Sequence, residues 1–195
     1  MKKAMKLVWM VLFALPMISL TACGDDDDLI DDNTGISINM KDYSDLLDKT
    51  RDDVMKKMNM DVADSDNNGI YYENVENGVP EVDVYYTFFE DNEYGAQQTY
   101  EKSVMVDVLV DGFPYNDLLN FVINKYGKGN LNNEGIYLIK KGDMYVWLEW
   151  DDEYEDGYIT FVKKSEWDKV YGALDTKAGE SNFIKMIRER RAARK

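Results

Sequence analysis

The stretch DMYVWLEWDDEY, residues 143–154, decides the predicted fold. Its first residues form two alternating sets, Met144, Val146, Leu148 and Trp150 against Tyr145, Trp147 and Glu149. Successive side chains of a strand point to opposite faces of a sheet, so this alternation predicts a strand. Residues 82–89 and 104–110 alternate in the same way, and 69–75 and 158–162 are shorter strand candidates. Turn dipeptides such as Asn77-Gly78 and Lys141-Gly142 separate them, which predicts antiparallel hairpins.

The same stretch has a partner in the first half of the chain. It matches DVYYTFFEDNEY, residues 83–94, with five identical residues in register. Two shorter matches precede it, YSDLL (43–47) with YNDLL (115–119) and NGIY (68–71) with EGIY (134–137). The offset falls from 72 to 66 to 60 residues, as expected if the second copy has shorter loops. These matches predict an internal duplication, with unit 1 at 40–112 and unit 2 at 113–172.

A helical pattern opens each unit. Apolar residues recur at helical spacing in 43–59, and Thr50 followed by Asp53 predicts that a second short helix begins near Arg51. Residues 115–126 show the same spacing, and Gly127 is a typical residue after a helix end. Each unit is therefore predicted to be α-β-β-β. Two such units side by side make one antiparallel sheet with helices on one face, which is an α+β fold.

This order of elements resembles the β-lactamase-inhibitor-protein-like fold, which is a tandem of such units. It also resembles the small outer-membrane-assembly lipoproteins, which have a single unit. The resemblance covers residues 40–172 and is architectural, with the Thr50-x-x-Asp53-Val54 helix start as its one motif. The inhibitor family carries disulfides, whereas this chain has a single cysteine. The resemblance implies that the open concave face of the sheet binds a partner.

Residues 1–22 have the pattern of a lipoprotein signal peptide. MKKAMK, with three lysines, precedes fourteen uncharged residues, LVWMVLFALPMISL. A membrane-spanning helix needs about twenty, and Pro16 also disfavours the alternative of a permanent anchor. Leu20-Thr21-Ala22-Cys23 resembles the bacterial lipobox, which implies cleavage before Cys23 and acylation of its thiol. A free thiol after an ordinary cleavage site is the other interpretation.

An acidic segment follows Cys23. Gly24 and Asp25–Asp28 resemble the export signal of Bacteroidetes-type surface lipoproteins, which implies display on the outer leaflet of the outer membrane. A domain that faces the periplasm is the alternative. Residues 23–39 show no sustained period and are predicted to be a flexible linker, because acidic runs are usually solvated. About sixteen flexible residues reach roughly 20–25 Å from the membrane.

Composition excludes several functions. The formal charge is −15, and it becomes −18 without residues 1–22, which hold three lysines and no acid. Such a chain is not expected to bind nucleic acid, which requires clustered Lys and Arg, whereas cationic partners are compatible with it. It has no histidine, and its one cysteine is assigned to lipid. Ser-His-Asp and Cys-His catalysis, His-ligated zinc and disulfides are thereby excluded, and we expect no enzymatic activity.

Four aromatic residues are candidates for a recognition patch. Tyr85, Phe89, Tyr145 and Trp147 fall on the odd-numbered side of the predicted strands, the face that the helices leave open. Tyr and Trp dominate binding hot spots, so we expect a protein or glycan partner there. The protein would then act as an inhibitor, serve as a structural accessory in an outer-membrane assembly, or bind glycans. The alternative is that these rings pack against each other or a loop.

Two further segments are candidate sites. DSDNNG (64–69) begins like a calcium loop, with Asp64, Asp66 and Asn68 at the first, third and fifth positions. Val75 stands at the twelfth, where a glutamate belongs, and an Asx-rich turn before a strand explains the same residues. No cofactor besides the covalent lipid is therefore expected.

The C-terminal tail, residues 173–195, ends in FIKMIRERRAARK, which has six basic residues and one acid. We expect this tail to dock on its own domain, to bind a partner, to contact anionic lipid, or to fray.

Overall fold

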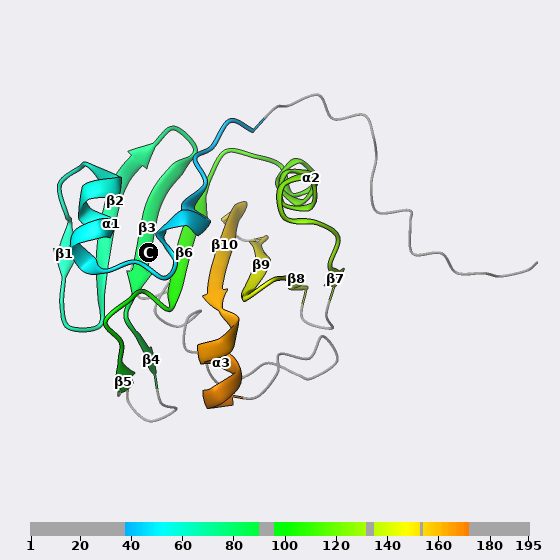
Figure 1. Ribbon diagram of the computed structural model, residues 1–195. Coiled ribbons are helices and arrows are strands. Elements are labelled where there is room, and N and C mark those ends of the chain that lie inside the picture. The colour runs from blue at the N-terminus through cyan, green and yellow to red at the C-terminus, as the bar shows by residue number, and fades with distance from the viewer. Residues whose placement is uncertain (1–37, 90–95, 132–134, 153, 172–195) are drawn as a thin grey trace, which may run out of the picture. The chain divides into compact units, whose positions relative to one another are not determined.

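The structure is a computed structural model, and it describes residues 38–89, 96–131, 135–152 and 154–171 (Figure 1). All described residues belong to one compact unit within residues 32–195.

Runs of strands lie between the helical segments of the described chain. The helical segments are a 3₁₀ turn η2 (Tyr43–Leu46) and the α-helices α1 (Arg51–Met58), α2 (Tyr115–Tyr126) and α3 (Lys164–Tyr171). The strands of the first half are β1 (Asp64–Ser65), β2 (Gly69–Glu76), β3 (Val79–Tyr85), β4 (Thr87–Phe89), β5 (Ala96–Thr99) and β6 (Met105–Val110). Those of the second half are β7 (Asn130–Leu131), β8 (Tyr137–Lys141), β9 (Met144–Asp151) and β10 (Asp156–Lys163).

One large sheet dominates the fold. Within the described ranges it has eight strands in the order β1-β2-β3-β6-β10-β9-β8-β7, while β4 and β5 pair in a separate two-stranded sheet. Each pair of neighbouring strands is antiparallel. The prediction of an α+β fold with a large antiparallel sheet is therefore confirmed.

The local signals for the helices are also confirmed. Thr50 caps α1: its hydroxyl accepts the backbone N–H of Asp53 and donates to the Asp53 carboxylate at 2.8 Å. This reciprocal pairing satisfies a donor that the first helical turn leaves open. Gly127 ends α2 with φ at 106°, a backbone conformation that glycine adopts readily.

The sheet separates two apolar clusters. The first cluster joins one face of the sheet, here the first face, to η2, α1 and α2, and includes Leu46, Val54, Tyr72, Val108 and Leu118. The second cluster joins the opposite, second face to α3 and β4, and includes Tyr85, Phe88, Met105, Trp147 and Trp167. In Figure 1, α1 and α2 lie before the sheet, on its first face.

The expectation that helices cover one face only is wrong. Trp167 of α3 is buried in the second cluster, so α3 packs on the face opposite α1 and α2. The pattern in 82–89 also predicted a single strand, whereas the structure divides it at Tyr86 into β3 and β4. The N–H of Tyr86 donates to the Asn68 carbonyl, and its own carbonyl accepts the Tyr100 N–H. These long-range bonds turn the chain away from the large sheet.

The sequence matches behind the predicted duplication do not coincide with the strand registers. The NGIY match aligns Ile70 with Ile136, but Ile70 belongs to the first cluster and Ile136 to the second. The match of 83–94 with 143–154 aligns Asp83, in the middle of β3, with Asp143, in the turn before β9. The YSDLL match is different, because Leu46 and Leu118 both lie in the first cluster, and Tyr43 and Tyr115 each begin a helical segment.

Candidate functional site

The predicted aromatic patch is not an exposed surface. Tyr85, Tyr145 and Trp147 do lie on the second face, but they are 4%, 0% and 1% exposed, so the expectation of an open patch is wrong for these three. Trp167 of α3 covers them, with its ring 5.7 Å from that of Trp147 in an edge-to-face arrangement. Phe89 lies in β4, in the two-stranded sheet, and its side chain is outside the described residues.

The predicted calcium segment forms a turn. One Asp66 carboxylate oxygen accepts the backbone N–H groups of Asn68 at 2.7 Å and Gly69 at 2.9 Å, and an Asp64 carboxylate oxygen accepts the Ser65 N–H. These bonds fit the Asx-turn interpretation. Asp64, Asp66 and Asn68 line a shallow pocket, and Asp83 forms part of its wall. In the described part of the chain, no three acidic, histidine or cysteine side chains are grouped so that they could hold a metal ion.

Cys23 and the basic tail lie outside the described residues. No helix in the described ranges is long and apolar enough to span a membrane.

The second face carries a row of carboxylates beyond the part that α3 covers. We call Glu73, Glu81, Asp83, Asp107 and Glu149 the acidic row. Their neighbours in sequence, such as Tyr72, Val82 and Val108, point into the first cluster, which places the acids on the second face. Lys and Arg are absent from the second face of the described strands β2, β3, β6, β9 and β10.

Strand pairing brings acids of like charge together. Asp83 of β3 lies directly opposite Asp107 of β6, and Glu73 of β2 lies opposite Glu81 of β3. Thr160 of β10 is opposite Asp107 and donates its hydroxyl to the Asp107 carboxylate at 2.6 Å. Like charges in directly opposed positions of neighbouring strands repel, so this arrangement favours the binding of positive charge.

The acids at the centre of this row are buried. Asp107 is 4% exposed and Asp83 is 8% exposed, whereas Glu73 at one end is exposed. A charged carboxylate removed from water is stable only with compensating charge or hydrogen bonds. The Thr160 hydroxyl supplies one such hydrogen bond to Asp107.

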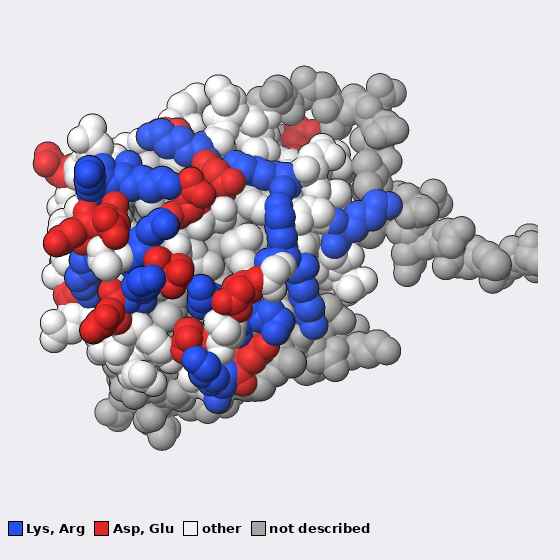
Figure 2. All heavy atoms as spheres, viewed as in Figure 1, with Lys and Arg blue, Asp and Glu red and all other residues white. Residues whose placement is uncertain are grey.

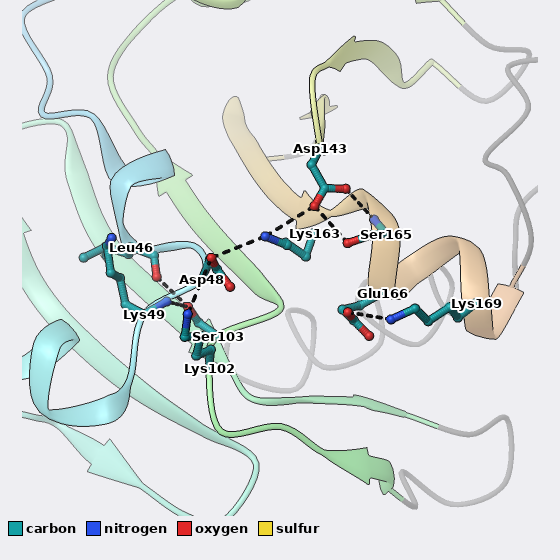
Figure 3. A network of polar contacts seen from close by, with 10 residues as sticks. All are labelled: Leu46, Asp48, Lys49, Lys102, Ser103, Asp143, Lys163, Ser165, Glu166 and Lys169. Carbon is teal, nitrogen blue, oxygen red and sulfur yellow. Dashed lines mark hydrogen bonds and ion pairs between the residues drawn. The ribbon is translucent and has the colours of Figure 1, made fainter.

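A polar network joins α3 to the rest of the domain (Figure 3). Lys163, at the end of β10, lies between Asp48 at 3.4 Å and Asp143 at 3.3 Å. Asp143, in the turn before β9, accepts both the backbone N–H and the hydroxyl of Ser165 in the first turn of α3. Burial alone raises the pKa of Asp143, but the bonds from Ser165 and the charge of Lys163 outweigh it, so this pKa lies below its usual value. The carboxylate thus stays charged and holds the start of α3.

Ser103 connects this network to the segment after η2. Its hydroxyl accepts the backbone N–H of Lys49 at 3.0 Å and donates to the carbonyl of Leu46 at 2.5 Å. The backbones also pair, because the Asp48 N–H donates to the Ser103 carbonyl and the Ser103 N–H donates to the Lys49 carbonyl. The contacts fix the chain between η2 and α1 against the chain before β6.

Replacing Ser103 with alanine is expected to lower the free energy of unfolding by about 1–3 kcal/mol, because the buried Leu46 carbonyl and the half-buried Lys49 N–H lose their partner. Chemical denaturation monitored by circular dichroism measures the change. Ser44→Ala is the matched control, since the Ser44 hydroxyl bonds Asp42 at the surface, and we expect a change within about 0.5 kcal/mol. Equal effects of the two substitutions would contradict this assignment.

The first face of the molecule has a different charge pattern. Figure 2 views the domain from the side of α1, and Lys and Arg lie among Asp and Glu over that surface. Ion pairs there include Lys57 with Asp45 at 2.6 Å. Basic and acidic side chains are therefore mixed on this face, unlike in the acidic row.

No family model matches the sequence, and no curated protein or solved structure matches it.

Sequence reasoning missed the acidic row. Asp83 and Asp107 were visible at alternate positions of two predicted strands, but their pairing depends on β3 lying beside β6 in one register. The sequence did contain one signal for this row, namely acidic residues at the strand positions predicted to face away from the helices. The sequence left open whether the aromatic rings pack inside the domain, and Tyr85, Tyr145 and Trp147 do so. The helix that covers them was not predicted.

Proposed function

We propose that this chain is a non-enzymatic cell-envelope lipoprotein, displayed at the cell surface, whose domain binds a positively charged macromolecular partner. Acyl chains on Cys23 anchor it to the outer membrane, and residues 23–39 form the tether. The binding surface is the accessible end of the acidic row on the second face, where Glu73 is exposed and Glu81 is partly exposed. The partner is a polypeptide with clustered Lys or Arg. By binding it, the protein acts as an inhibitor of that partner in one version of this proposal.

The paired carboxylates of the acidic row carry this proposal. Asp83 opposite Asp107 and Glu73 opposite Glu81 concentrate negative charge on one surface of a sheet. Rows of one charge raise the association rate of oppositely charged partners. The glycan-binding and accessory hypotheses have no comparable support, since the aromatic residues on which the former rested are buried.

The domain is further proposed to consist of two tandem α-β-β-β units. Strands β1, β2, β3 and β6 form one half of the sheet, and β10, β9, β8 and β7 form the other in mirrored order. A helical segment that begins with the YSDLL or YNDLL motif precedes each half, η2 with α1 in one case and α2 in the other. These observations support a duplication whose strands have since shifted in register.

Titration of the full-length protein with hexalysine at low ionic strength tests the binding surface. Glu73→Gln combined with Glu81→Gln is expected to weaken binding by about tenfold, because each of these carboxylates contributes to attraction that is screened only beyond about 10 Å. Asp52→Asn combined with Asp61→Asn is the control, since both acids are exposed and lie outside the row. Equal loss from both double variants would show that the probe responds to net charge alone, and would contradict a localised surface.

A further inference from the structure

We propose that the basic C-terminal segment of this same chain, residues 183–195, occupies the acidic row, and that a cationic partner binds by displacing it. This inference rests on the proposed binding surface and adds its regulation. The segment thus competes with external partners for that surface.

The burial of the second face points to an occupant. Tyr158 of β10 lies on this face opposite Leu109 and Glu149, is 6% exposed, and is a member of neither apolar cluster. Glu149 is 9% exposed. The apolar packing of α3 and β4 around Trp167 involves the other end of the strands, at Tyr85 and Val162. The packing of α3 and β4 alone does not account for the burial around Tyr158, which favours a further covering segment.

Charge complementarity identifies the segment. The acidic row has five carboxylates, and two of its cross-strand pairs place like charges in opposition. Residues 183–195 hold six basic side chains and one acid in a chain whose formal charge is −15. Positive charge supplied from within the chain relieves the repulsion without the entropy loss of a second molecule.

The connection is long enough and begins on the correct side of the sheet. Helix α3 ends at Tyr171, and Trp167 places this helix on the second face. Fourteen residues lead from Tyr171 to Lys185 and reach up to about 46 Å at about 3.3 Å per residue. From β10 to β2 there are three strand spacings, which is about 15 Å at about 4.8 Å each. The segment can therefore reach every carboxylate of the row.

Apolar residues also match across the two surfaces. Tyr71, Leu109 and Tyr158 lie among the carboxylates of the second face. The tail also contains apolar residues next to its basic ones, namely Phe183, Ile184 and Ile187. Their spacing would place them on one side of a helix. Both surfaces thus combine charge with an apolar stripe, which favours this pairing over a purely electrostatic one.

Occupation of the row by the tail makes binding of a partner competitive. If the covered form outnumbers the open form about tenfold, the apparent affinity for any external cationic ligand falls by about tenfold. Removing the positive charge of the tail should restore the intrinsic affinity.

The test measures binding of a synthetic peptide with the sequence of residues 180–195 to three chains: the full-length protein, a chain that ends at Gly179, and the full-length Arg188→Gln, Arg190→Gln, Arg191→Gln variant. Fluorescence anisotropy at low ionic strength gives the affinities. We expect the second and third chains to bind the peptide about tenfold more tightly than the first. In the shortened chain, Glu73→Gln with Glu81→Gln should remove this gain, and Asp52→Asn with Asp61→Asn should keep it.

Equal peptide affinities for the three chains would overturn the inference. If hexalysine still responded to Glu73→Gln and Glu81→Gln in that case, the binding surface would stand and only its occupation by the tail would fail. Equal affinities together with tail-dependent binding of the full-length protein to phosphatidylglycerol vesicles would show that the tail contacts lipid instead. If the shortened chain does not fold, the comparison of the full-length protein with its triple Arg→Gln variant still tests the inference.

Discussion

Replacing Trp167 with alanine is expected to lower the free energy of unfolding by about 3–5 kcal/mol, the range for loss of a fully buried large aromatic side chain. Trp167 is 1% exposed, and its ring meets those of Phe88 at 5.8 Å and Trp147 at 5.7 Å in edge-to-face contacts. It is the residue through which α3 covers the second face. The substitution should therefore also expose Trp147.

Denaturant titration measures the loss of stability, and acrylamide quenching of tryptophan fluorescence measures the exposure. Met55→Ala on α1 is the control, because Met55 is 41% exposed, and its effect should stay within about 0.5 kcal/mol. A loss of less than about 1 kcal/mol for Trp167→Ala would show that α3 does not hold the second cluster together.

Elements with their own local signals could be predicted from the sequence. Helix α1 has the Thr50–Asp53 cap, α2 has a regular apolar stripe and Gly127, and the long strands have strict alternation. The hairpin turns at Gly78 and Gly142 were also predicted, and both glycines have the positive φ that such turns require.

Elements that depend on distant residues were not predicted. Helix α3 follows β10 without a loop, and its first turn is held by Asp143 from the hairpin between β8 and β9 rather than by a neighbour in sequence. The break at Tyr86 likewise depends on Asn68 and Tyr100. Periodicity within a segment carries no information about such contacts.

The candidate site shows the same limit. Sequence alternation placed Tyr145 and Trp147 correctly on one face, but it could not show that α3 buries them. The acids of the second face were present in the same strands, and only the order β2-β3-β6-β10-β9 brings them into one region of the sheet. Net charge was compatible with a cationic partner, whereas the location of the acids depended on the sheet.

The second large effect concerns the anchor. Replacing Cys23 with serine is expected to abolish acylation, because the hydroxyl does not replace the thiol that the lipobox pattern LTAC presents. Each buried methylene of an acyl chain contributes about 0.8 kcal/mol to membrane binding, so two chains hold a protein at a membrane far more firmly than one. Gly24→Ser is the matched control, since it alters the next residue and leaves the cysteine in place.

Metabolic labelling with radioactive palmitate tests the envelope assignment most directly. We expect the wild-type protein and Gly24→Ser to carry the label in the membrane fraction and Cys23→Ser to carry none. An unlabelled wild-type protein recovered free in the culture medium would contradict it.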